Sequence, residues 1–210
     1  MRVFVETNFI LELAFRQEQS LACEQLLQLA ETKVLQLCIP AFCFIEPAEK
    51  LRREIPDAEA LQNRLVKELE KRRRSEGFSE PQQHAWNEVI ASLVKDTSDA
   101  EQRLESIRAR VLQCADVFPV DAEVIARAAS LEAEDIRLQF PDAVVLASVM
   151  ARLEEDAGLA RPPSLFLNRN SNDFDVSSVK LALRQLHCKL ITRFDDGLGA
   201  VQAGLRVRSS

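Results

Sequence analysis

Short apolar runs recur along the chain, and the segments between them are longer and carry apolar residues at helical spacing. Four of the short runs consist mostly of β-branched, aromatic and other apolar residues, a composition that favours buried strands. They span residues 3–5, 34–39, 165–167 and 190–192. A fifth run, 117–120, contains a proline, which is typical of an edge strand. The pattern therefore predicts five strands.

Helical spacing of apolar residues marks most of the intervening segments. The expected helices lie within residues 10–30, 41–51, 121–131, 141–153 and 179–186. Asp121 stands where it can cap the helix that follows, and Pro141 occupies the favoured first turn of the next one. Pro47 lies inside the second of these segments, so we expect that helix to begin or to kink there.

Residues 57–115 have helical spacing throughout and stand between the second and third predicted strands. Elsewhere strands alternate with helices, which predicts an α/β fold with a mostly parallel central sheet. We therefore expect a single domain over residues 1–210, with an all-helical insertion at about 57–115.

The composition is compatible with this fold and excludes several classes of protein. Of the 210 residues, 47% are hydrophobic and 29% are charged, which is the balance of a globular domain with a substantial core. The net charge of −6 provides no overall attraction to nucleic acid or to an anionic membrane. The longest apolar stretch, 34–45, is too short to span a bilayer. We expect a cytoplasmic protein without a membrane partner.

The five cysteines support the same location. Their number is odd, none forms a C-x-x-C motif, and most stand in apolar runs. We therefore expect buried thiols in a reducing compartment rather than disulfides or zinc ligands.

Acidic residues follow several predicted strands, where a parallel sheet gathers its functional groups. The four candidates are Glu6, Glu46, Asp142 and Asp173. Carboxylates that share a cleft repel one another, and either protonation or a hard divalent cation relieves that repulsion. Mg²⁺ or Mn²⁺ held by oxygen ligands can promote in-line displacement at phosphorus. The two histidines, His84 and His187, are too far apart in sequence to suggest a metal motif or a triad.

Each acid also has an ordinary structural explanation. A helix start favours an acid such as Asp142, and Asp173 stands among turn-forming Asn and Ser residues. Glu46 fits a solvated helix surface and Glu6 a polar strand end. The four together favour an acidic metal site over coincidence.

The same residues lie in motifs that resemble those of PIN-domain ribonucleases, in the same order. The similar segments are 3–8, like the family's first strand and Asp-Thr-Asn; 39–46, like its second strand and helical Glu; 140–148, like its Asp-Ala-x-x-x-Ala-Ser helix start; 165–174, like its strand and loop ending in Asp-Phe; and 191–198, like its closing segment. The resemblance covers most of the chain outside 57–115. It implies a PIN-like three-layer α/β/α fold.

The resemblance also implies a role for each candidate. Glu6, Glu46, Asp142 and Asp173 would be the catalytic, metal-binding set for Mg²⁺ or Mn²⁺. Asn8 would brace the first carboxylate, and Asn168 would match the family's Thr or Ser near the scissile phosphate. Arg169 and Asn170 would bind substrate or support the site.

Two residues depart from the family pattern. Glu6 replaces the usual Asp and is one methylene longer, which could shift the metal and weaken activity. Asn170 stands where the family often has Asp, so Asp173 or Asp175 must supply the charge there.

We therefore expect a divalent-metal-dependent endoribonuclease that hydrolyses RNA phosphodiester bonds. The resemblance implies that such a protein can be the toxin of a toxin-antitoxin pair with a small antitoxin protein as its partner, although the helical insertion is atypical of compact toxins. The sequence leaves a homodimer open. The alternative function is a catalytically weakened PIN-like module that binds RNA or a protein partner without cleavage.

Two features of the insertion leave alternatives open. The basic run 71–74 is either a solvated helical face, which the acids around it favour, or a surface that reaches RNA phosphates. Trp86 either packs between the inserted helices or stacks on bases, and the packing role is favoured.

Overall fold

Five parallel strands form one central sheet in the computed structural model, which describes residues 1–75, 77–134, 138–155, 163–169, 174 and 176–209. The strands are β1 (Arg2–Val5), β2 (Gln36–Pro40), β3 (Asp116–Phe118), β4 (Ser164–Leu167) and β5 (Cys188–Ile191). Their order across the sheet is β3-β2-β1-β4-β5, and each neighbouring pair is parallel. All five strands lie at the predicted places, so the expected α/β fold class is confirmed.

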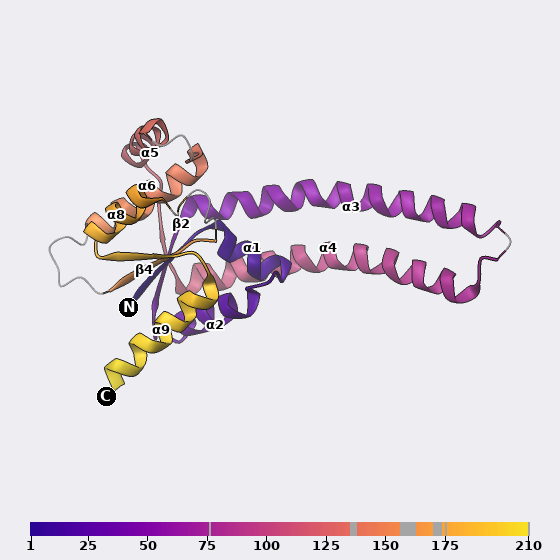
Figure 1. The fold of residues 1–210 in the computed structure, drawn as a ribbon, viewed down its shortest axis with the longest axis horizontal. Helices are drawn as coiled ribbons and strands as arrows, with labels where there is room; N and C mark the ends of the chain where they lie inside the picture. The colour runs from indigo at the N-terminus through magenta and orange to yellow at the C-terminus, as the bar shows by residue number, and fades with distance from the viewer. Residues whose placement is uncertain (76, 135–137, 156–162, 170–173, 175, 210) are drawn as a thin grey trace.

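Helices cover both faces of this sheet and complete the three-layer α/β/α arrangement. The helices α5, α6 and α8 lie on one face, and α1, α2 and α9 lie on the other (Figure 1). The helical elements are α1 (Thr7–Phe15), α2 (Ser20–Glu31), η1 (a 3₁₀ turn, Ala41–Phe44), α3 (Ile45–Arg72), α4 (Glu80–Cys114), α5 (Ala122–Glu134), α6 (Phe140–Glu155), α8 (Ser177–Gln185) and α9 (Phe194–Ser209).

The central strand β1 is enclosed on all sides. Val3, Phe4 and Val5 have no exposed surface. Phe4 is aligned with Cys38 of β2 and with Phe166 of β4. A parallel strand covered on both faces needs uninterrupted apolar residues, which is why so short a run identifies it in the sequence.

Several helix ends follow the predicted signals. The Asp121 carboxylate accepts a hydrogen bond from the main-chain N–H of Val124 at 2.9 Å and so caps α5. Pro141 is the second residue of α6. Pro47 is the third residue of α3, where a main-chain N–H would have no helical acceptor, so this helix begins near the proline. The predicted segment 10–30 contains two helices, which a left-handed Arg16 (φ 50°) separates.

The C-terminal helix α9 was not among the predicted helices. Its glycines lower intrinsic helix propensity, so the local signal is weak. Tertiary packing overrides that preference, since Phe194 and Val201 are buried in the core. At Gly197 a β-carbon would come within 2.6 Å of the Leu167 side chain, so a larger residue there would force that side chain to move.

The inserted helices α3 and α4 form a long antiparallel pair that projects from the sheet (Figure 1). They begin at Ile45 rather than at 57, because α3 continues through Pro56 despite the hydrogen bond that a proline removes. The division of the chain into one domain with a helical insertion stays a prediction. The helices of that insertion are α3 (Ile45–Arg72) and α4 (Glu80–Cys114).

The two ends of this pair differ in their packing. Near the sheet, Leu104, Ile107 and Val111 of α4 belong to the main hydrophobic core, and α4 packs against α1. Farther out, Leu61 of α3 is 42% exposed. The proximal end of α4 is therefore part of the core that holds the sheet.

The cysteines are placed as the sequence predicts. None of the five, all of which lie in described segments, forms a disulfide. Four are buried, and Cys114 is half-buried. Within the described residues, no helix has both the length and the apolar character that a bilayer crossing requires.

Candidate active site

A cleft opens beside the carboxyl ends of β1 and β4. The chain moves from β1 to β2 and β3 on one side of the sheet and then returns to β4 and β5 on the other side. Strand order therefore reverses between β1 and β4, the point at which open α/β sheets bind ligands. The cleft has a volume of about 710 Å³ and is lined by α1, η1, α3, α6 and the segment that follows β4.

Glu6 stands directly after β1, lines the cleft and is the N-cap of α1. Its side chain is buried. Glu6 Oε2 accepts a hydrogen bond from the main-chain N–H of Asn8 at 2.7 Å, and Oε1 accepts one from the N–H of Arg169 at 3.3 Å. The Asn8 side chain also hydrogen-bonds to Glu6. Asn8 therefore contacts the Glu6 carboxylate, and its role in bracing a catalytic acid stays a prediction.

Burial raises the pKa of Glu6 to about 7. The hydrogen bonds from Asn8 and Arg169 act in the opposite direction, and the charge of Asp142 adds to the increase. A carboxyl group that titrates near neutral pH in a cleft is a candidate functional group. Asp142 lines the same cleft as Glu6, so its negative charge disfavours a second negative charge on Glu6.

Asp142 and Glu46 reach the same cleft from two helix starts. Asp142 is half-buried in the first turn of α6, and Glu46 is exposed in the first turn of α3. The helix dipole stabilises a negative charge at both positions. The structure thus brings three of the four predicted acids, Glu6, Glu46 and Asp142, to one cleft.

The segment after β4 contributes the remaining candidates. Asn168 is buried, lines the cleft and donates its main-chain N–H to the Ile191 carbonyl at 3.0 Å. The chain is back in the core at Phe174, whose ring packs edge-on against Phe166 at 5.7 Å between centroids. Three positions considered in the sequence lie outside the described residues: Asn170, Asp173 and Asp175.

Arg169 lines the cleft, but its guanidinium group is held by protein acceptors. It forms an ion pair with Glu12 and donates to Gln17 Oε1 at 3.0 Å. Sequence reasoning missed Glu12, which has no exposed surface. The available signal was a single acid within the apolar helix that follows the first strand.

Glu49 is a second residue that sequence reasoning missed. It lines the cleft one helical turn after Glu46. Its carboxylate lies 3.0 Å from the Arg52 guanidinium group on the same helix. The spacing of three residues from Glu46 is the signal that could have identified it.

The donor set of the cleft fits a hard divalent cation. Glu6, Glu46 and Asp142 offer only carboxylate oxygens, which suit Mg²⁺ or Mn²⁺. The raised pKa of Glu6 reflects burial and repulsion that a bound cation would relieve. Within the described ranges, no group of three or more His, Cys, Asp or Glu side chains is arranged to hold a metal ion.

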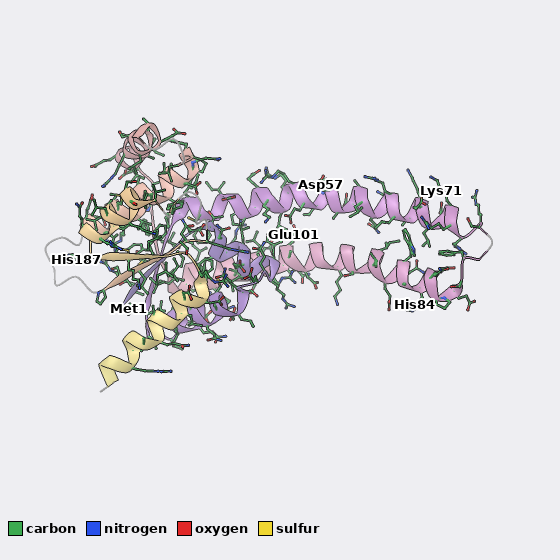
Figure 2. The ribbon with its side chains drawn as sticks, in the orientation of Figure 1. Met1, Asp57, Lys71, His84, Glu101 and His187 are labelled. Atoms are coloured by element: carbon green, nitrogen blue, oxygen red, sulfur yellow. The ribbon has the colours of Figure 1, made fainter. Side chains whose placement is uncertain are left out.

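The basic run and the histidines lie apart from this cleft. Lys71 and His84 are at the distal end of the helical pair, whereas His187 lies near the sheet (Figure 2). Arg72 contacts Glu68 at 3.3 Å, and its guanidinium group lies 5.8 Å from the centroid of the Trp86 ring. This contact agrees with the predicted packing of Trp86 between the inserted helices.

Comparison with known proteins gives a match to a family model and a similarity to a solved structure. A family model described as a PIN domain matches residues 3–174. No curated protein matches the chain. A similar solved structure is VapBC2 from Rickettsia felis bound to a DNA fragment from its promoter, which shares 12% identity over 91% of this chain and 98% of that chain, with a TM-score of 0.44. That likeness is too weak to support an argument about this chain.

Proposed function

Because the chain belongs to the PIN domain family, we propose that it is a divalent-metal-dependent endoribonuclease that hydrolyses RNA phosphodiester bonds. The observation that carries this proposal is the arrival of Glu6, Glu46 and Asp142 at one cleft from three separate elements. Their position at the reversal of strand order is where an α/β sheet gathers its chemistry.

The acidic residues would hold Mg²⁺ or Mn²⁺ and keep it in place. Glu6, Glu46 and Asp142 would supply carboxylate oxygens, and Asp173 would complete the set from the loop after β4. When bound, the cation would supply Lewis acidity and offset the negative charge of the phosphodiester. Glu6 is buried, so this ligand would be shielded from most of the solvent.

The polar residues around the acids would orient them and the RNA. Asn8 holds Glu6 through both its main chain and its side chain. Asn168 lines the cleft beside Glu6, where it would lie near the scissile phosphate. Arg169 would support the site, and Asn170 would bind substrate or a water molecule.

A toxin role with a small antitoxin protein, a cytoplasmic location and a homodimer are further parts of this proposal. The toxin role and the antitoxin rest on the family resemblance of the sequence motifs, and the cytoplasmic location rests on the cysteines and on the short length of the apolar stretches. The homodimer is left open by the sequence. Coexpression with the product of the adjacent reading frame, followed by copurification, would test the antitoxin.

RNA cleavage is the direct test of the proposed activity. We expect the purified protein to cut labelled single-stranded RNA in Mn²⁺ and to stop in EDTA. Asp142→Asn and Glu46→Gln should each lower the rate by at least about a hundredfold, because each removes an anionic oxygen ligand. Glu54→Gln is the matched control on α3, since Glu54 pairs with Lys50 outside the cleft.

Two results would refute the nuclease proposal. One is cleavage that continues in EDTA, and the other is cleavage that Asp142→Asn and Glu46→Gln leave at the wild-type rate. Either would assign the activity to another site or to a contaminant.

One observation favours the alternative of a PIN-like module that binds RNA or a protein partner without cutting. Both Glu6 oxygens already accept main-chain hydrogen bonds, so this acid acts as a helix cap as well as a candidate ligand. Intact RNA that is retained on the protein in Mn²⁺, with no cleavage, would support this alternative.

A further inference from the structure

An ion pair between the buried Glu12 and the half-buried Arg169, which lines the cleft, joins the cleft to two other parts of the chain. Glu12 has no exposed surface, and its carboxylate contacts the guanidinium group of Arg169. Glu12 Oε2 also accepts the main-chain N–H of Gln19 at 2.8 Å. Both carboxylate oxygens therefore have donors, as a buried charge requires.

Arg169 is held at several points along its length. Its Nη1 donates to Glu12 and to Gln17 Oε1, the latter at 3.0 Å, and its Nη2 lies 3.6 Å from the Glu18 carboxylate. These acceptors belong to α1 and the turn that follows it. Nη1 is thus committed to protein acceptors, and Nη2 faces a carboxylate at a distance longer than a hydrogen bond.

The main chain of Arg169 contacts one of the acids in the cleft. Its N–H donates to Glu6 Oε1 at 3.3 Å. Gln19, whose N–H binds Glu12, accepts the main-chain N–H of Phe194 through its side chain at 2.6 Å. One continuous network therefore runs from Glu6 through Arg169 and Glu12 to the start of α9.

We propose that Glu12 is a positioning residue that, through Arg169, holds the segment after β4 against Glu6 and so sets the geometry of the acidic cleft. The proposal rests on the proposed metal-dependent function for its effect on activity. In this arrangement Arg169 acts through its ion pair with Glu12 and its main-chain N–H to Glu6.

The test compares Glu12→Gln with Glu18→Gln. Both changes remove one carboxylate that faces Arg169, but Glu12 is buried, whereas the Glu18 side chain is 61% exposed. Arg169→Gln and the double variant Glu12→Gln/Arg169→Gln complete a double-mutant cycle. Three readouts are taken well below the unfolding temperature: amide hydrogen exchange at Arg169 without metal, the Mn²⁺ dissociation constant, and kcat and KM for RNA cleavage.

We expect Glu12→Gln to speed exchange of the Arg169 amide by about tenfold or more, because the guanidinium group loses its main acceptor. Mn²⁺ affinity should fall by about tenfold, the usual range for a residue that orients a metal ligand. The kcat should fall with Mn²⁺ affinity while KM for RNA stays within about twofold. The double variant should be no worse than the poorer single variant, and Glu18→Gln should change each readout by less than about twofold.

A merely structural role is distinguishable from this outcome. If Glu12→Gln lowers Tm but leaves Arg169 exchange and Mn²⁺ affinity at the wild-type level, the proposal is overturned. It is also overturned if Arg169→Gln raises KM for RNA while Glu12→Gln changes nothing, because Arg169 would then bind substrate.

The test also covers a Glu12→Gln variant that does not fold and a wild-type protein that has no metal-dependent activity. If Glu12→Gln does not fold, Arg169→Lys replaces it in the test. Lysine keeps the positive charge but lacks the planar guanidinium group. The exchange rate of residue 169 and the Mn²⁺ affinity of this variant should therefore lie between those of wild type and Arg169→Gln. If the wild-type protein neither binds Mn²⁺ nor cuts RNA, the proposed function fails. The exchange rate of the Arg169 amide then still decides whether Glu12 positions this segment.

Discussion

Glu6 has two roles that compete at the scale of a single residue. It caps α1 by accepting the Asn8 N–H, and it is the buried member of the acidic set in the cleft. Burial raises the pKa of Glu6 to about 7, so near neutral pH a proton and a cation compete for the same oxygens. The stability of the metal-free protein and its affinity for metal are therefore linked to pH through one carboxyl group.

This linkage predicts how the stability of the metal-free protein changes with pH. The pKa of Glu6 is 4.5 in its ordinary environment and about 7 in the folded protein, so between these values the folded state keeps a proton that the unfolded state releases. The free energy of unfolding should therefore fall as pH rises through this window, by on the order of 3 kcal/mol from Glu6 alone. Urea unfolding in EDTA at pH 5 and pH 8 measures it.

Glu6→Gln is the matched variant for this measurement. Glutamine has nearly the same shape as glutamate but no charge. The variant should therefore lose the part of the pH dependence of unfolding that comes from Glu6, and it should be more stable than wild type at pH 8 in EDTA. An equal decrease between pH 5 and pH 8 in both proteins would show that Glu6 does not titrate in this range.

At the scale of the elements, the long helical pair has a core end and a free end. Near the sheet, α4 supplies buried residues to the main core, whereas the distal part of α3 and α4 packs mainly within the pair. A single helix can therefore stabilise the domain at one end and tolerate change at the other.

Matched truncations on the pair measure this difference. Leu104 is 3% exposed, so Leu104→Ala should lower the free energy of unfolding by about 2–5 kcal/mol through lost burial and a cavity. Leu61 is 42% exposed, and Leu61→Ala should cost less than about 1 kcal/mol. Urea unfolding monitored by circular dichroism compares the two, and equal costs would mean that α4 is not part of the core.

The basic end of the pair has its own prediction. Arg72 contacts Glu68, and Lys71 lies at the distal end of the pair, away from the sheet (Figure 2). We expect Arg73→Gln/Arg74→Gln to leave the RNA cleavage rate and the salt dependence of RNA binding unchanged within about twofold. A salt dependence that becomes clearly shallower would instead place phosphates on this surface.

At the scale of the whole molecule, a net charge of −6 is joined to a cleft that gathers several acids. Phosphates approach such a cleft only when its charge is offset, and a bound divalent cation would neutralise part of that charge. The bulk charge therefore does not exclude RNA as a partner.

This charge arrangement predicts metal-dependent binding of RNA. A short single-stranded RNA with hydrolysis-resistant phosphorothioate linkages should bind at least about tenfold more weakly in EDTA than in Mn²⁺, because the free carboxylates repel its backbone. Filter binding at fixed ionic strength measures the two affinities. Equal affinities would place RNA outside the acidic cleft.

Local chemistry made much of this fold predictable from the sequence. The apolar run 3–5 marks a strand that is covered on both faces, and Asp121 and Pro141 mark helix starts at which their side chains are favourable. The continuation of α3 through Pro56 and the formation of α9 were not predictable in this way, because tertiary packing there overrides the preferences of proline and glycine.

The sequence by itself determined the strands, most of the helices, the fold class and the four acidic candidates, since all of these depend on neighbouring residues and on spacing along the chain. Only the tertiary structure decided which groups meet. Strand order brings Glu6, Glu46 and Asp142 to one cleft, and it places Arg169 beside Glu12, 157 positions away in the chain. The spacing of residues along the chain does not indicate contacts between positions so far apart. Burial, which raises the pKa of Glu6, arises only when the helices pack on the sheet.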